Sequence, residues 1–149
     1  MSAIAMSESA PREPRSAHGG RFALIGVATV VAAVLANVVV YYIGSALVGY
    51  DPGFVVLAGV SGTILFTVTP AIVAVLLYAA LPRVSGNPTR LFKIIAAVVF
   101  VVTLMPDFVY VPTVPGSSGD QIAILVLMHV VAAVVIVGML TTLARARSR

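Results

Sequence analysis

A single histidine stands inside a long apolar stretch near the end of the chain. His129 lies in the sequence ILVLMHVVAAVVIVG (Ile124–Gly138), whereas the other histidine, His18, precedes the first apolar segment. An imidazole titrates near neutral pH, and its neutral form both donates and accepts a hydrogen bond. An ionisable residue inside a membrane-spanning segment is a functional-site candidate by default, so the chemistry of His129 must be explained first.

Polar side chains recur at a similar depth in the other apolar segments. His129 lies seven residues inside its predicted helix. A rise of about 1.5 Å per residue then places it roughly 10 Å below the outer membrane boundary. We therefore predict an intramembrane polar layer formed by Asn37, Ser61, Thr63, Thr103, Asp107 and His129.

Small and hydroxylated residues at helical spacing predict which face of each helix is turned inward, because they let helices approach closely in lipid. In chain order, the predicted inward faces carry Gly26, Thr29, Ala33, Asn37, Gly44 and Ser45, then Gly59, Thr63, Thr67, Ala71 and Ala74, then Ala96, Val99, Thr103 and Asp107, and finally His129, Ala132 and Ala133. The polar layer is thus expected between the helices.

Two interpretations of His129 remain open. In the structural one, the ring bonds to a side chain of another helix, and Asn37, Thr63 and Thr103 are the candidate partners. Such bonds contribute about 0.6 kcal/mol on average and up to about 1.7 kcal/mol. In the functional one, His129 takes part in proton or ligand binding.

Asp107 also has two interpretations. It follows Pro106, and a proline inside a helix removes a hydrogen bond and kinks or ends the helix. The carboxylate could therefore be solvated where the third helix breaks at the outer surface. Alternatively, Asp107 pairs with His129, and this contact favours the charged imidazolium.

Several kinds of chemistry are not expected. The chain has no cysteine, and its second histidine lies in the N-terminal tail, so no metal site and no cofactor such as a bis-histidine haem is predicted. Hydrolysis needs a nucleophile beside a base, and Ser61 with His129 is only a weak candidate, so an enzyme is not favoured. The basic residues form no patch with interleaved aromatic residues, so nucleic acid is not an expected partner.

The elements that carry these residues follow from composition. The chain is 60% hydrophobic and 9% charged, whereas a soluble domain has about 25% charged residues. Apolar segments run over about 22–48, 54–81, 91–111 and 122–143. Each is long enough to cross a bilayer and must be helical there. Because the connections are short, we predict an all-α integral membrane protein with four helices in an up-down-up-down antiparallel bundle.

The flanking segments and the charges predict the orientation. Residues 1–20 read as a disordered tail, 21–144 as the membrane domain and 145–149 as a basic tail. All nine basic residues lie in the tails, in the middle loop or at the adjoining helix ends, whereas the other loops carry Asp51 and Asp120. The positive-inside rule then places both termini in the cytoplasm.

Three short stretches resemble an uncharacterised family of bacterial four-span membrane proteins that share a domain of unknown function. They are the single residue Asn37 and the segments LMP (Leu104–Pro106) and LMHVVAAVVIVGML (Leu127–Leu140). The resemblance covers about residues 20–145, and Met128–His129 is its most recognisable element. It implies four helices in a bacterial inner membrane and no known activity. Asp107 is not associated with the family, so the resemblance does not imply its pairing with His129.

The leading functional hypothesis is a non-enzymatic membrane protein, either an accessory subunit or a small-molecule binder, with a polar interior. The alternative is a small oligomeric transporter or channel that uses His129 as a protonatable group. The bilayer is the expected environment. The expected protein partners are a second copy of the chain or an unidentified membrane protein.

Overall fold

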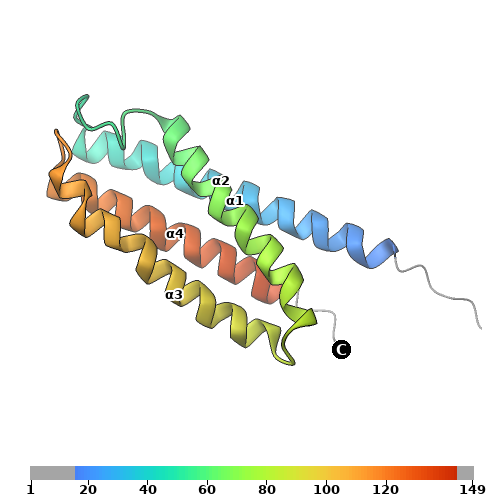
Figure 1. Ribbon diagram of the computed structural model, residues 1–149. Helices are drawn as coiled ribbons and strands as arrows, with labels where there is room; N and C mark the ends of the chain where they lie inside the picture. The colour runs from blue at the N-terminus through green and yellow to red at the C-terminus, as the bar shows by residue number, and fades with distance from the viewer. Residues whose placement is uncertain (1–15, 144–149) are drawn as a thin grey trace, which may run out of the picture.

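The computed structural model describes the backbone of residues 16–143 and the side chains of residues 20–143, and over this range it is helical without strands. The helices are α1 (Ser16–Val48), α2 (Val60–Ala80), α3 (Pro88–Val109) and α4 (Gly119–Leu143), with short 3-10 helices η1 (Leu81–Arg83) and η2 (Val111–Thr113). Figure 1 shows their arrangement along the chain.

The four long helices have the length and composition of membrane spans. The apolar spans are Gly20–Val48, Val60–Arg83, Pro88–Thr113 and Gly119–Leu143, with hydropathies of 2.3 to 2.9. Large apolar side chains on their surfaces are exposed, such as Leu47 at 78% and Phe66 at 76%. Exposing such an apolar surface costs free energy in water but not in lipid. The predicted all-helical fold with four membrane-length helices is confirmed, and it fits an integral membrane protein.

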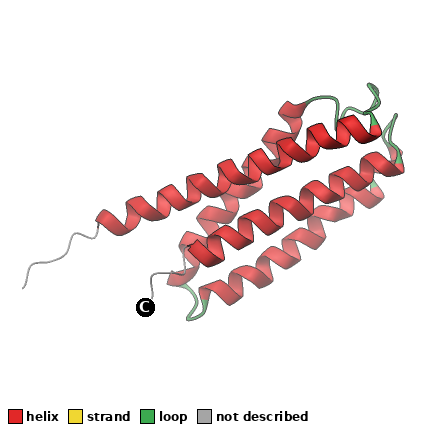
Figure 2. Ribbon diagram, turned by 180° about the vertical axis from the view of Figure 1, so that it is seen from behind, coloured by secondary structure: helices red, strands yellow, loops and turns green. Residues whose placement is uncertain are grey.

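The helices pack unevenly. α1 has its most extensive contacts with α4 and α2, whereas α3 packs mainly against α4 and touches α2 less. In Figures 1 and 2 the α1–α2 and α3–α4 connections lie at one end of the molecule, and the α2–α3 turn lies at the other. We call the first the loop end (residues 49–59 and 110–118) and the second the turn end (residues 81–87).

An aromatic cluster fills the core near the turn end. The ring of Tyr78 stands edge-on to that of Phe92, with centroids 5.0 Å apart, and stacks with Phe22 at 6.5 Å. The Tyr78 hydroxyl lies 3.3 Å from the Thr89 hydroxyl. Aromatic pairs of this geometry contribute about 0.5–1.5 kcal/mol beyond the area that they bury. This cluster joins the starts of α1 and α3 to the end of α2.

The second apolar segment departs from its predicted bounds. It was predicted to be helical from Phe54, but α2 begins at Val60. The chain makes turns before the helix, with hydrogen bonds from the Phe54 amide to the Asp51 carbonyl and from the Leu57 amide to the Phe54 carbonyl. Phe54 and Leu57 are fully buried there. A buried apolar loop and a helix are equally hydrophobic, so hydropathy could not separate them.

The other helix ends also differ from prediction. α3 begins at Pro88, three residues before the predicted start, because proline suits the first helical position and Asn87 Oδ1 accepts the Arg90 amide at 3.2 Å. α1 already includes residues 16–20, which were assigned to the disordered tail. The rest of that tail and the predicted basic tail 145–149 lie outside the described residues.

A side-chain clamp joins the two connections at the loop end. Gln121 Nε2 donates to the Gly116 carbonyl at 3.0 Å, and Gln121 Oε1 accepts the Asp51 amide at 3.4 Å. Gly116 has a φ of 77°, and a Cβ there would lie 2.9 Å from the Phe54 nitrogen. The position therefore requires glycine on both conformational and steric grounds.

Two tyrosines hold the α1–α2 connection against α1. The Tyr50 hydroxyl donates to the Tyr41 carbonyl at 2.9 Å, and the Tyr41 hydroxyl donates to the Leu57 carbonyl at 3.2 Å. Burial, and to a lesser extent the neighbouring Tyr41, raises the pKa of Tyr50 above its ordinary value of 10.0. The Tyr50 phenol is therefore kept in its hydrogen-bond-donating form.

Candidate functional site

One polar contact in the interior joins α1 to α2. Asn37 is only 4% exposed, and its Nδ2 donates to the Thr67 hydroxyl at 2.9 Å. That hydroxyl in turn donates to the Thr63 carbonyl at 2.7 Å. The Thr67 hydroxyl has one hydrogen and donates it to the Thr63 carbonyl. Its oxygen can therefore only accept a hydrogen bond from Asn37, so the Asn37 amide is the donor. The contact is therefore a directed chain of neutral hydrogen bonds.

The Asn37 contact uses only part of the amide. Its Oδ1 is buried, and no group among residues 20–143 donates to it. Thr63, another member of the predicted layer, is also buried and takes part through its backbone carbonyl. Neither Asn37 nor its threonine neighbours titrate in the physiological range, so this contact can orient helices but cannot exchange a proton.

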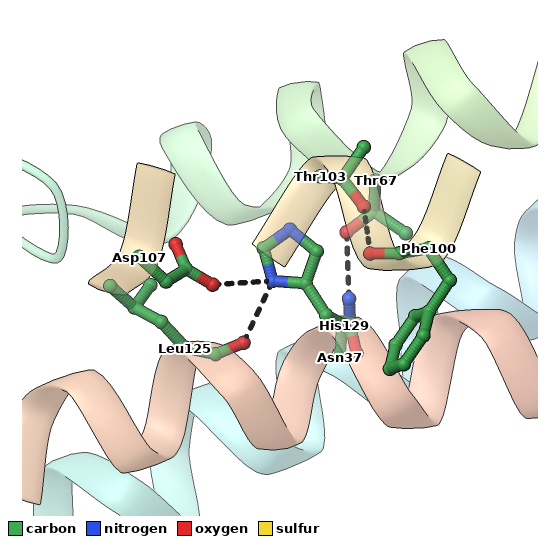
Figure 3. Close-up of polar contacts among 7 residues, drawn as sticks. All are labelled: Asn37, Thr67, Phe100, Thr103, Asp107, Leu125 and His129. Atoms are coloured by element: carbon green, nitrogen blue, oxygen red, sulfur yellow. Dashed lines mark hydrogen bonds and ion pairs between the residues drawn. The ribbon is translucent and has the colours of Figure 1, made fainter. Parts of the chain in front are cut away.

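A second interior contact joins α3 to α4 and is ionisable. His129 Nδ1 lies 3.1 Å from Asp107 Oδ2 and 3.0 Å from the Leu125 carbonyl oxygen. Figure 3 shows both contacts converging on the same ring nitrogen, with the carboxylate and the carbonyl on one side of the imidazole. The Asp107 side chain is 8% exposed and the His129 side chain 33%. The carboxylate is thus enclosed, while part of the ring reaches the surface of the chain.

This geometry assigns the proton on the imidazole. The Leu125 carbonyl can only accept, so the Nδ1 that bonds it at 3.0 Å must carry a hydrogen, while Asp107 Oδ2 lies at ion-pair distance, 3.1 Å away, without accepting a hydrogen bond. In the neutral ring, Nε2 is then the nitrogen with a free lone pair. In Figure 3 this nitrogen lies on the ring edge away from Asp107 and Leu125. The pair therefore presents one basic atom, Nε2 of His129.

Asp107 is positioned by helix α3 itself. The helix continues through Pro106 to Val109, so the proline does not end it before the carboxylate. Asp107 remains on a helical face that is turned toward α4, and the residue is buried at 5% exposure. The expectation of a solvated carboxylate is wrong, and the structure bears out the alternative in which Asp107 pairs with His129.

Two residues of the predicted layer lie elsewhere. Ser61 is exposed in the first turn of α2, and Thr103 is exposed on α3, where its hydroxyl donates to the Phe100 carbonyl at 2.9 Å. A hydroxyl can satisfy itself on the preceding helical turn, so it does not need an interior partner. The structure therefore places Ser61 and Thr103 on the surface of the chain and not beside Asn37 or His129.

The predicted inward face of α3 is also only partly right. Asp107 is buried, but Val99 and Thr103 are exposed, and the buried residues of α3 are Thr89, Phe92 and Asp107. α3 packs mainly against one neighbour, so it needs only a narrow buried face. In lipid no hydrophobic force selects that face, which makes small-residue spacing a poor guide on this helix.

Two residues that the structure makes important were not in the predicted layer. Thr67 is the partner of Asn37, and Gln121 closes the clamp at the loop end. Thr67 did lie on the predicted inward face of its segment, four residues after Thr63, so its position was foreseeable. Gln121 gave no such signal, because its contacts join segments far apart in sequence.

Comparison with known proteins identifies a family and no function. Residues 18–146 match the model of a family of unknown function, DUF6069. The match includes all four long helices and both interior polar contacts. No curated protein and no solved structure matches the chain.

Proposed function

The chain belongs to DUF6069, a family of unknown function, and on this premise we propose that it is a non-enzymatic integral membrane protein with a binding site at Asp107 and His129. The site takes a proton, or a small molecule that donates a hydrogen bond, at Nε2 of His129. One observation carries this proposal: Nδ1 lies 3.0 Å from the Leu125 carbonyl oxygen and 3.1 Å from the Asp107 carboxylate. This contact leaves Nε2 as the basic atom.

The net charge of the Asp107–His129 pair determines which kind of ligand the proposed site would bind. With a neutral ring, the pair carries the single negative charge of an enclosed carboxylate, which is costly to bury without compensation. Binding a proton at Nε2 makes the ring cationic and the pair neutral. An ammonium group that donates to Nε2 brings a positive charge and gives part of the same compensation. The preferred ligand is thus a proton or a small amine.

Binding is favoured over catalysis by the surroundings of the ring. An aspartate that holds the Nδ1–H of a histidine also orients general bases in hydrolases. Such enzymes need a nucleophile within hydrogen-bond reach of the other ring nitrogen. Within the described part of the chain, the polar contacts of His129 are with Asp107 and Leu125 only. Ser61, the candidate nucleophile, is exposed in the first turn of α2.

An oligomeric transporter or channel is the second candidate. It is supported by the partial exposure of His129, because the open edge of the ring lies where a second copy of the chain could cover it. A path lined by the pair would then form between copies. Proton or amine flux into vesicles containing the protein, abolished by His129→Leu, would favour this candidate. If vesicles that contain the protein at high density show no flux, the binding function is favoured over transport.

The proposed orientation is an up-down-up-down antiparallel bundle in a bacterial inner membrane, with both termini in the cytoplasm. Its support is the charge separation among the described residues. The loop end and its adjoining turns carry Asp51, Asp107 and Asp120, whereas the opposite end carries Arg21, Arg83, Arg90 and Lys93. Positive charge marks the cytoplasmic side. Alkaline-phosphatase fusions after Asp51 and Ser117 should be active and one after Ser85 inactive, and the reverse pattern would contradict the orientation.

A pH series tests the binding function. Between pH 5 and 8 histidine is the side chain whose ordinary titration changes its charge. Proton uptake by the folded pair relieves its buried charge, so the melting temperature of the solubilised protein should fall as pH rises in the wild type and in His18→Gln, which alters the start of α1. His129→Gln should flatten that variation. The same pH dependence in all three proteins would show that His129 binds no proton in this range.

A further inference from the structure

The start of α3 presents two cationic side chains above an apolar strip. A shallow pocket of about 430 Å³ lies along this surface, lined by Asn87, Thr89, Arg90, Lys93, Ile94 and Ala97. Arg90, Lys93, Ile94 and Ala97 are all exposed. Their positions at i, i+3, i+4 and i+7 place them on one helical face. This surface is therefore positively charged at one end and apolar along the rest.

Among residues 20–143, the two cations have no acidic partner nearby. The one ion pair in this range joins His129 to Asp107, and the described aspartates all lie in or near the loop end. Arg83, in the same turn region, differs because its guanidinium donates to the Ala79 carbonyl. The backbone amide of Arg90 is already bonded to the Asn87 side chain. The binding capacity of this surface therefore lies in the side chains of Arg90 and Lys93, not in the helix terminus.

We propose that this surface binds the headgroup of an anionic phospholipid. The phosphate lies between the Arg90 guanidinium, which can bond it in two places, and the Lys93 ammonium, which adds a point charge. An acyl chain runs along Ile94 and Ala97 toward the middle of the membrane. The span containing these residues begins at Pro88, so both cations lie in its first two turns, at the depth of headgroups.

Charge and hydrocarbon together select a lipid over free phosphate. An exposed cation attracts phosphate only weakly at physiological salt, because water and ions screen the interaction. Juxtamembrane cations contribute about 1 kcal/mol each toward an anionic lipid surface. Covering Ile94, which is 53% exposed, adds an apolar contact that inorganic phosphate cannot make. This site lies at the opposite end of the molecule from the Asp107–His129 pair and is independent of the function proposed for that pair.

Native mass spectrometry with defined lipids tests the proposal. Solubilised full-length protein is titrated with phosphatidylglycerol or with phosphatidylcholine of the same acyl chains. The wild type should bind phosphatidylglycerol at least 10-fold more tightly than phosphatidylcholine. Arg90→Gln/Lys93→Gln should lose that preference. The matched control Arg21→Gln/Arg83→Gln removes the same charge from the same end of the molecule and should keep it.

Each other result overturns the proposal. Equal binding of both lipids by the wild type would show that no anionic headgroup is recognised. An equal loss in both double variants would show that overall charge, not this surface, attracts the lipid. Inorganic phosphate that displaces phosphatidylglycerol at equal concentration would show that the apolar strip contributes nothing. All four substituted side chains are exposed, so unchanged melting temperatures will confirm that the variants are folded.

Discussion

The two interior contacts differ in the chemistry that they can perform. Asn37 and Thr67 join α1 to α2 through neutral groups, both buried. Asp107 and His129 join α3 to α4 through ionisable groups, and the His129 side chain is 33% exposed. Both contacts link neighbouring helices in the interior. Two interior polar contacts can therefore be similar in position and differ in charge, and the proposed function depends on the ionisable one.

The largest effect on the unfolding free energy is expected from removing one partner of the Asp107–His129 contact. His129→Leu leaves the Asp107 carboxylate enclosed and unpaired, which should cost about 3 kcal/mol of unfolding free energy. Replacing both residues, with Asp107→Leu/His129→Leu, should recover most of that loss because no charge remains buried. Reversible unfolding in mixed micelles measures both variants. A double variant as unstable as the single one would show that the pair contributes through packing, not charge.

A smaller effect is expected from breaking the neutral contact. Thr67→Val removes the acceptor of the Asn37 amide and should cost about 1.5 kcal/mol, near the upper end for hydrogen bonds between membrane helices. The cost should be the same at pH 5.5 and at pH 8, because no group in this contact titrates there. A cost that changes between the two pH values would remove the distinction drawn between the contacts.

Tyr50 extends the comparison to a contact outside the spans. Tyr50→Phe removes the hydrogen bond to Tyr41 and should cost about 1 kcal/mol at pH 8. Burial raises the Tyr50 pKa in the folded state, so this contribution is complete below about pH 10, the ordinary value, and is lost as pH rises through the folded value. Melting curves of wild type and variant should converge at alkaline pH. A difference that stays constant through the alkaline range would contradict the assignment.

The smallest effect is expected at Thr103. This residue lies on α3 one turn before Asp107, but it is exposed and bonds its own helix. Thr103→Val should change the unfolding free energy by less than about 0.5 kcal/mol. It should also leave the pH dependence of the melting temperature intact. A loss of that dependence would place Thr103 in the same site as His129 after all.

The membrane fold was predictable because one physical requirement dominates it. Apolar runs long enough to cross lipid must form helices there, and this requirement holds whatever the detailed packing. The start of α2 was not predictable in the same way. Phe54 and Leu57 are as hydrophobic as a span, and only their burial against neighbouring segments shows that they form a loop.

The site was predictable in part. The polarity and depth of Asn37, Asp107 and His129 identified them as interior residues, and the structure buries the first two and half-buries the third. Their pairing could not be derived, because depth along a helix does not fix rotation about its axis. Thr103 shows the consequence: it lies one turn from Asp107 and at a comparable depth, yet its side chain is exposed.

The tautomer of His129 is the most direct test of the account. The measurement is nitrogen NMR of the His18→Ala protein in lipid, labelled at histidine, so that the signals of His129 are the only ones from an imidazole. Because Nδ1 bonds the Leu125 carbonyl, the neutral ring is expected to be protonated at Nδ1. A neutral ring protonated at Nε2 would contradict the proposed site.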